Sequence, residues 1–184
     1  MMTLSLYPQN KDKVVKLIDF LARVLDVCKE IDVYPILDGG MAVFLYTQNP
    51  KIIVNDIDLS CSEKYFKKIL KALVNKGFKA EIKEWHVLQI REDDLKIEFG
   101  DMDFWYPGVP VEVGKYIKIR GHKLGILRLD SLISFYRIGI KNLEKEKEQK
   151  QAKYNALKAK YELLIRAGKT RGVTNPENEN LQRT

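Results

Sequence analysis

Hydrophobic residues recur at three- and four-residue spacing along much of the chain, which predicts amphipathic helices. These helices are expected over Lys11 to Ile31, over Glu63 to Lys76, from near Asp130 onward, and over a segment that ends at Gly168. A shorter, apolar segment from Met41 to Thr47 predicts a buried helix. Asn10 and Ser62 precede two of these segments and are expected to cap them, because their side chains accept hydrogen bonds from free N–H groups.

Short runs rich in β-branched and aromatic residues lie between the helices and predict strands. They are Tyr34 to Leu37, Ile52 to Ser60, Phe78 to Lys83, Trp85 to Arg91, Leu95 to Phe99 and Tyr116 to Arg120. In the second run, Ile57 and Leu59 alternate with Asp56 and Asp58. Side chains alternate across a strand, so one face is apolar and the other carries two acids.

Composition limits the class of protein. The chain has 184 residues, of which 45% are hydrophobic and 31% charged. That length suits one compact domain with an extension, and the apolar content excludes a disordered chain. No apolar run approaches the roughly 18 residues of a membrane span, and residues 1–13 lack the features of a signal peptide. We therefore expect no membrane association and a cytoplasmic location.

Cysteine and histidine are too few and too scattered for a disulfide framework or a zinc site. Cys28 and Cys61 lie far apart, outside any C-x-x-C arrangement, and are expected to be reduced and buried. His86 and His122 are the only histidines, and neither has a partner at ligand spacing.

The net charge of +7 is concentrated near the C-terminus. Residues 141–171 hold ten Lys and Arg against four Glu, so the rest of the chain is nearly neutral. This basic segment leaves nucleic acid open as a partner, and a solvated helix face is the simpler explanation.

Three sequence features typical of sites that bind phosphate and metal ions occur in the body of the chain. Asp56 and Asp58 repel each other unless a cation lies between them, and their oxygen ligands suit Mg²⁺. Upstream, Gly39 and Gly40 stand between a strand and a helix, where backbone N–H groups can approach phosphate oxygens. Downstream, Glu98 faces away from the apolar neighbours that flank it.

This set resembles the nucleotidyltransferase superfamily, which includes DNA polymerase beta, lincosamide and aminoglycoside nucleotidyltransferases, and toxins of the abortive-infection type. The matching motifs read LDGGMAVFLY (37–46), NDIDLS (55–60) and LKIEFGD (95–101). The helix that ends in Lys76-Gly77-Phe78 makes the small lincosamide-type branch the closest in appearance.

The resemblance implies an α+β fold, in which a mixed β-sheet is flanked by helices and followed by a C-terminal helical extension. It implies a catalytic domain over residues 1–128 and a helical segment over 129–170, and residues 171–184 are expected to form a flexible tail. The oligomeric state does not follow from the sequence.

The resemblance also implies a reaction: transfer of a nucleoside monophosphate from a nucleoside triphosphate (NTP) to a hydroxyl acceptor, with release of pyrophosphate. Asp56, Asp58 and Glu98 would hold Mg²⁺ or Mn²⁺ and act in catalysis, and Gly39 and Gly40 would contact the phosphates. The acceptor could be a small molecule, a protein side chain or an RNA end.

Two departures from the family pattern favour an alternative, a non-catalytic nucleotide- or RNA-binding module, which could be one half of a toxin–antitoxin pair. Many members carry Ser after the first Gly, whereas this chain has Gly40 and then Met41, and relatives often carry Arg where this chain has Ile52. The third acid is also open: Asp101 or Asp103 could replace Glu98 if the strand register differed by a few residues.

Some other side chains are candidates with a simpler structural explanation. The aromatic residues Trp85, Trp105 and Tyr106 could stack on a base or an acceptor ring, although core or edge packing is the commoner role. Four cations could contact phosphates and are more simply surface residues: Arg120, Lys123, Arg128 and Arg137.

Overall fold

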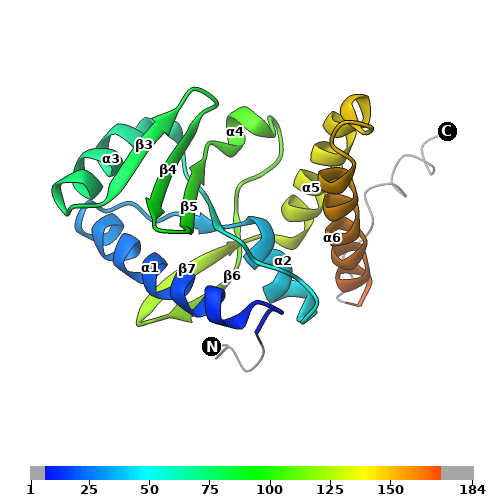
Figure 1. The fold of residues 1–184 in the computed structure, drawn as a ribbon, viewed down its shortest axis with the longest axis horizontal. Coiled ribbons are helices and arrows are strands. Elements are labelled where there is room, and N and C mark those ends of the chain that lie inside the picture. The colour runs from blue at the N-terminus through cyan, green and yellow to red at the C-terminus, as the bar shows by residue number, and fades with distance from the viewer. Residues whose placement is uncertain (1–6, 171–184) are drawn as a thin grey trace.

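A computed structural model describes residues 7–170 of the chain (Figure 1). Its centre is a mixed seven-stranded sheet with strand order β3-β4-β5-β2-β1-β7-β6. The strands are β1 (Ile36–Leu37), β2 (Ile57–Ser60), β3 (Lys79–Lys83), β4 (Val87–Glu92), β5 (Leu95–Gly100), β6 (Val113–Ile119) and β7 (His122–Leu127). The predicted α+β class is confirmed.

Helices pack around this sheet in two groups. Helix α1 (Lys11–Glu30) contacts α3 (Phe66–Asn75) and β5, and α3 also packs on β3. On the other side of Figure 1, α6 (Gln151–Lys169) packs against α5 (Leu129–Leu143) and against α2 (Gly39–Thr47). The remaining helices are short: η1 (Glu63–Tyr65), α4 (Met102–Trp105) and η2 (Glu144–Glu146).

The C-terminal helix belongs to the same core as the sheet. Leu164 of α6 is fully buried and joins the apolar cluster that also contains residues of α1, α2 and the central strands. Its burial places the basic helix beside the body of the molecule. Residues 171–184, predicted to be a flexible tail, lie outside the described residues.

The strand β7 was not predicted, although it pairs with β1 near the centre of the sheet. It forms a hairpin with β6, and the loop residues Arg120 and Gly121 both have positive φ. Positive φ at both loop residues matches the twist of two-residue hairpins. The last four residues of β7 are all buried, so the strand lacks the alternation of buried and exposed residues that would have predicted it.

The predicted strand from Ile52 is wrong over its first half, because β2 begins only at Ile57. The backbone of Val54 is bound by the side chain of Asn10, which donates to the Val54 carbonyl at 2.7 Å and accepts from its N–H at 3.1 Å. Asn10 therefore makes no capping bond to α1, contrary to prediction. Ser62 does not cap its helix either.

No helix within residues 7–170 combines the length and apolar composition that a membrane crossing needs.

Candidate active site

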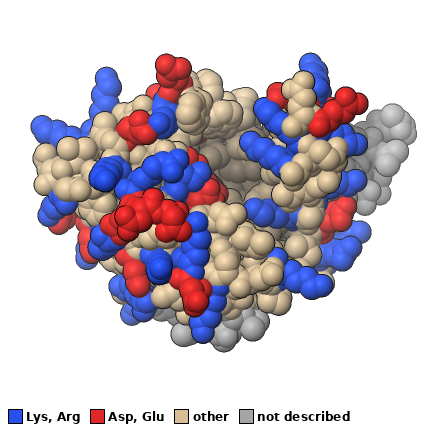
Figure 2. Space-filling model, in the orientation of Figure 1, with Lys and Arg blue, Asp and Glu red and all other residues tan. Residues whose placement is uncertain are grey.

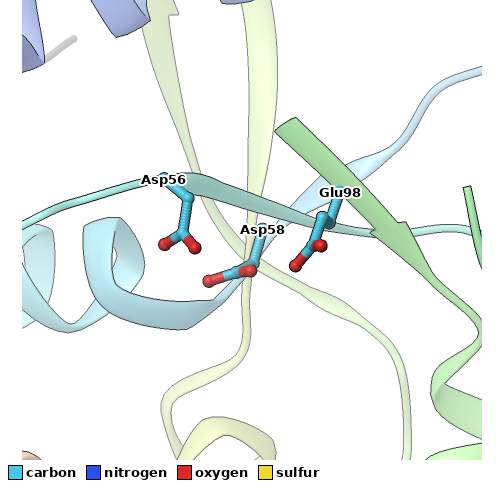
Figure 3. Close-up of side chains that lie close together, drawn as sticks. All are labelled: Asp56, Asp58 and Glu98. Atoms are coloured by element: carbon cyan, nitrogen blue, oxygen red, sulfur yellow. The ribbon is translucent and has the colours of Figure 1, made fainter. Parts of the chain in front are cut away.

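The pairing of β2 with β5 brings the three predicted acids together. These strands are parallel, and Asp58 lies opposite Glu98 in their register. Asp56 immediately precedes β2, and its carboxylate lies beside the other two (Figure 3). One oxygen from each of the three carboxylates lies within 4.8 Å of the others. The alternation of the sequence therefore predicted the right faces of two strands that meet only in the folded sheet.

The alternative third acids lie outside this cluster. The Asp101 carboxylate accepts hydrogen bonds from the backbone N–H groups of Glu63, Asp103 and Phe104, which fixes the start of η1 and of α4. Glu98, rather than Asp101 or Asp103, is therefore the acid that the fold places beside the aspartate pair.

A lysine that the sequence analysis did not single out lies at the centre of the cluster. The Lys96 ammonium is 2.8 Å from Asp56 Oδ2 and 3.0 Å from Glu98 Oε2. Burial would lower the pKa of Lys96, but its hydrogen bonds to the two carboxylates raise the pKa above its ordinary value. The acids thus already stabilise a cation, and their hard oxygen donors fit Mg²⁺ or Mn²⁺.

Glu98 is held from the neighbouring strand. Gln89 of β4 is paired with Glu98 in the sheet, is buried, and donates a hydrogen bond of 2.5 Å to Glu98 Oε1. Arg91 in turn donates to Gln89 Oε1 at 2.7 Å. These bonds fix the amide of Gln89 and through it the orientation of the carboxylate.

Gly39 allows the start of α2 to touch Asp58. Its φ is +59°, and a Cβ at this position would overlap the Asp58 carboxylate. A backbone hydrogen bond also joins the residue before α2 to β2, because the N–H of Asp38 donates to the carbonyl of Asp58 at 3.0 Å. Glycine at 39 is therefore required both by the left-handed backbone and by the close approach of an acid.

Asp38 adds a fourth acid that sequence reasoning did not assign to the site. It is buried, and its carboxylate accepts a hydrogen bond from the Ser60 hydroxyl. Burial raises the pKa of Asp38 to about 8, an effect that the charge of Asp58 increases and the bond from Ser60 opposes. Its position at the end of β1, directly before Gly39, is the signal that could have revealed it.

The pKa of Asp58 is raised to about 7. Burial is the main cause, and repulsion by Asp56 and Glu98 adds to it, while Lys96 and Lys160 act in the opposite direction. An ionised Asp58 is therefore disfavoured unless more positive charge is supplied next to it.

A cavity of about 350 Å³ opens beside these acids, between β5, α4 and the C-terminal helices. Figure 2 shows the hollow, with Lys and Arg side chains gathered on the side of the C-terminal helices. Trp105 and Tyr106 line the cavity, and Tyr106 stacks on Phe135 with ring centroids 4.2 Å apart. Trp85 does not line it and is 51% exposed.

The remaining candidates have structural explanations or lie away from the cavity. Arg120 pairs with Asp19, Arg128 pairs with Asp130 and Glu112, and Lys123 lies over the ring of Tyr116. None of these cations lines the cavity, and neither does Arg137. Cys28 and Cys61 are free thiols. Among residues 7–170, neither histidine belongs to a group that could hold a metal.

Replacing Gly39 by alanine should displace Asp58 and break the cation site. Gly77→Ala is a matched control, because Gly77 also has positive φ (+84°) but has no atom within 4 Å of the place that an added methyl group would take. Both variants should lose about 1 kcal/mol of stability from backbone strain. Only Gly39→Ala should also weaken Mn²⁺ binding, by about tenfold or more, as measured by electron paramagnetic resonance. Equal Mn²⁺ affinities in the two variants would contradict the role assigned to Gly39.

Asp58→Asn should stabilise the metal-free protein at alkaline pH. The ordinary pKa of Asp is about 3.9, so the unfolded chain releases the Asp58 proton at a much lower pH than the folded protein does. A raised folded-state pKa therefore means that stability is lost as the pH rises from about 4 through about 7. We expect the variant to gain about 1–3 kcal/mol over wild type at pH 8, or several degrees in melting temperature, and little at pH 4.5.

Thermal melts in EDTA across this pH range test the expectation. A difference between wild type and Asp58→Asn that stays constant with pH would contradict it. Mn²⁺ at pH 8 should raise the melting temperature of wild type and should leave that of Asp58→Asn nearly unchanged.

Comparisons with solved structures find the same fold in nucleotidyltransferases. ANT(2″)-Ia, solved with adenylyl-2″-tobramycin, aligns with a TM-score of 0.56 and 14% identity over 84% of this chain and 97% of its own. An antigenic nucleotidyltransferase-like protein from Paracoccidioides brasiliensis aligns with a TM-score of 0.54 and 16% identity, over 84% of this chain and 76% of its own.

A third structure, the Megavirus polyadenylate synthase, gives a TM-score of 0.50 at 13% identity, over 93% of this chain and 36% of its own. At these identities the likeness shows the fold alone. No curated protein sequence matches this chain.

A family model matches the sequence itself. The model of aminoglycoside-2″-adenylyltransferases matches residues 20–152, which contain the Gly-Gly turn, the aspartate pair and Glu98. The resemblance to the nucleotidyltransferase superfamily is thereby confirmed, and with it the prediction of an enzyme of that class. The chain belongs to the aminoglycoside-2″-adenylyltransferase family of nucleotidyltransferases.

Proposed function

We propose that this protein transfers a nucleoside monophosphate from an NTP to a hydroxyl group of a small-molecule acceptor and releases pyrophosphate. The observation that carries the proposal is the convergence of Asp56, Asp58 and Glu98 beside the Gly39-Gly40 turn. A site for cations next to a helix N-terminus suits a bound triphosphate. ATP is the first nucleotide to test, because the family is one of adenylyltransferases.

In the proposed reaction the acceptor oxygen attacks the α-phosphorus of the NTP. A new bond forms between that oxygen and the phosphorus, and the bond from the phosphorus to the oxygen that bridges to the β-phosphate breaks. The electron pair of the broken bond leaves with pyrophosphate. Glu98 accepts the proton of the hydroxyl, and its bond from Gln89 keeps its carboxylate oriented.

Asp56, Asp58 and Glu98 would hold the divalent ions. Bound Mg²⁺ or Mn²⁺ would supply positive charge that offsets the negative charge of the transferring phosphoryl group and would acidify the acceptor hydroxyl. The backbone N–H groups at the start of α2 would orient the β- and γ-phosphates, since the first turn of a helix has N–H groups without intrahelical partners.

The surroundings of the acids support a small acceptor that carries positive charge and packs on aromatic rings. The cavity beside Glu98 is lined by Met102, Trp105, Tyr106 and Phe135, and the acids that line it are Asp38, Asp58 and Glu98. The aminoglycoside adenylyltransferase family to which the chain belongs, and the adenylyl-tobramycin bound to ANT(2″)-Ia, make aminoglycosides the first acceptors to test.

The test is an assay of pyrophosphate release with Mg²⁺ or Mn²⁺, each labelled NTP, and a panel of acceptors that begins with tobramycin. Asp58→Asn keeps the shape of the side chain and removes its charge, so activity should fall by at least about 100-fold. Asp93→Asn is the control, because Asp93 is an exposed turn residue with positive φ that Asn tolerates. EDTA should abolish the activity.

If wild type binds no NTP and behaves like Asp58→Asn with every acceptor, the proposal is wrong. If NTP binds with unchanged affinity in both proteins and no product forms, the non-catalytic binding module is the better description.

A further inference from the structure

A lysine of the C-terminal helix reaches the start of α2, where the proposed function puts the triphosphate. Lys160 is half-buried on α6, and its Nζ lies 3.2 Å from the position that a Cβ on Gly40 would occupy. Gly40 is the second residue of α2 and is itself buried. The missing side chain at position 40 thus leaves room for the ammonium group.

The charge of Lys160 has no close partner in the described part of the chain. Within residues 7–170, Lys160 forms neither a salt bridge nor a hydrogen bond, whereas Lys96 contacts two carboxylates. The positive charge of Lys160 lowers the pKa of Asp58 through space, without a direct contact, and is one of several causes that act on this pKa. A half-buried ammonium without an ion-pair partner is costly, and it is stabilised when an anion binds.

Other positive groups lie near Lys160. The N-terminus of α2 carries partial positive charge, has no acidic residue in its first turn, and receives no capping bond from the Asp38 side chain. Lys160 lines a second cleft, of about 560 Å³, together with Lys51 and Arg166, and Glu162 is the acid in this lining. Three cations therefore line this cleft, and one of them, Lys160, also reaches the N-terminal turn of α2 at Gly40.

A second lysine extends this arrangement along the helix. Lys153 precedes Lys160 by two helical turns, about 10 Å along the axis. It lines the cavity that contains Asp38, Asp58 and Glu98. The basic C-terminal helix thus lies beside the candidate active site: Lys153 lines the same cavity as Gly39, and Lys160 lies close to Gly40.

We propose that Lys160 binds the β- and γ-phosphates of the NTP, as a cation supplied by the C-terminal helix. This inference rests on the proposed function. It explains how a site without a hydroxyl side chain at positions 40 and 41 and without Arg at position 52 binds a triphosphate: the cation comes from α6.

The test compares Lys160→Ala with Lys158→Ala. Lys158 is exposed on the same helix, lies about 200° around it, and lines neither cleft, so it controls for the loss of one positive charge. Binding of ATP, AMP and pyrophosphate is measured by calorimetry with Mg²⁺ present. Lys160→Ala should weaken the binding of ATP and of pyrophosphate by about 10- to 100-fold, the range for a hydrogen bond to a charged group. It should hardly affect the binding of AMP.

Kinetics and a rescue variant separate a phosphate-binding role from a structural one. In Lys160→Ala, KM for the NTP should rise while KM for the acceptor stays unchanged, and the melting temperature without ligand should not fall. Gly40→Ser in the Lys160→Ala background should recover part of the pyrophosphate affinity, because the hydroxyl enters the space that the ammonium leaves.

Three outcomes overturn the inference. If wild type binds ATP and Lys160→Ala binds it equally well, Lys160 has no such role, although the proposed function stands. If Lys158→Ala weakens the binding of ATP as much as Lys160→Ala does, the loss comes from the lower overall positive charge and not from a contact made by Lys160. If wild type binds neither ATP nor pyrophosphate, the proposed function fails together with the inference.

Discussion

The repulsion among carboxylates at the end of the central strands is the constraint on which the rest of this structure depends. Asp38 is buried, Asp58 is half-buried, and Asp56 and Glu98 lie beside Asp58. Such a group of acids is costly to ionise inside a protein, because burial and like charge both favour the neutral forms. The fold offsets this cost with Lys96 between two of the acids and with the Ser60 hydroxyl on Asp38. What remains is an excess of negative charge, which a bound cation would offset.

The same constraint explains why the backbone near the acids allows so little change. Asp58 can approach the first turn of α2 only because Gly39 has no Cβ and adopts a left-handed conformation. The positive end of α2 then stands next to the acids, while Gln89 fixes Glu98 from the opposite side. Moving any of these elements by a few tenths of an ångström would alter distances within a cluster that spans 4.8 Å. Catalytic constellations depend on this kind of positional control.

Sequence patterns predicted the parts of this arrangement that depend on local periodicity. The alternation around Asp56 and Asp58, and around Glu98, identified which face of each strand carries the acids, and the sheet register confirms that they meet. Local patterns could not show where β2 begins, because the partner that binds Val54 is Asn10, which is 44 residues away in the chain. They also missed β7, since a continuous apolar run does not distinguish a central strand from a buried helix. The contact of Lys96 with Asp56 and that of Asp38 with Ser60 join residues that are distant in the chain, so local patterns could not show them.

The positive charge of the chain is better understood from its position than from its total. The sequence showed that the excess of Lys and Arg lies after residue 140, and a solvated helix face was the simplest explanation. The burial of Leu164 turns α6 onto the body of the protein and brings Lys160 to Gly40. Other lysines of the same helix, such as Lys158, remain exposed and fit the simpler explanation. One helix thus carries cations of two kinds, and the apolar contact that orients the helix decides which of them face the acids.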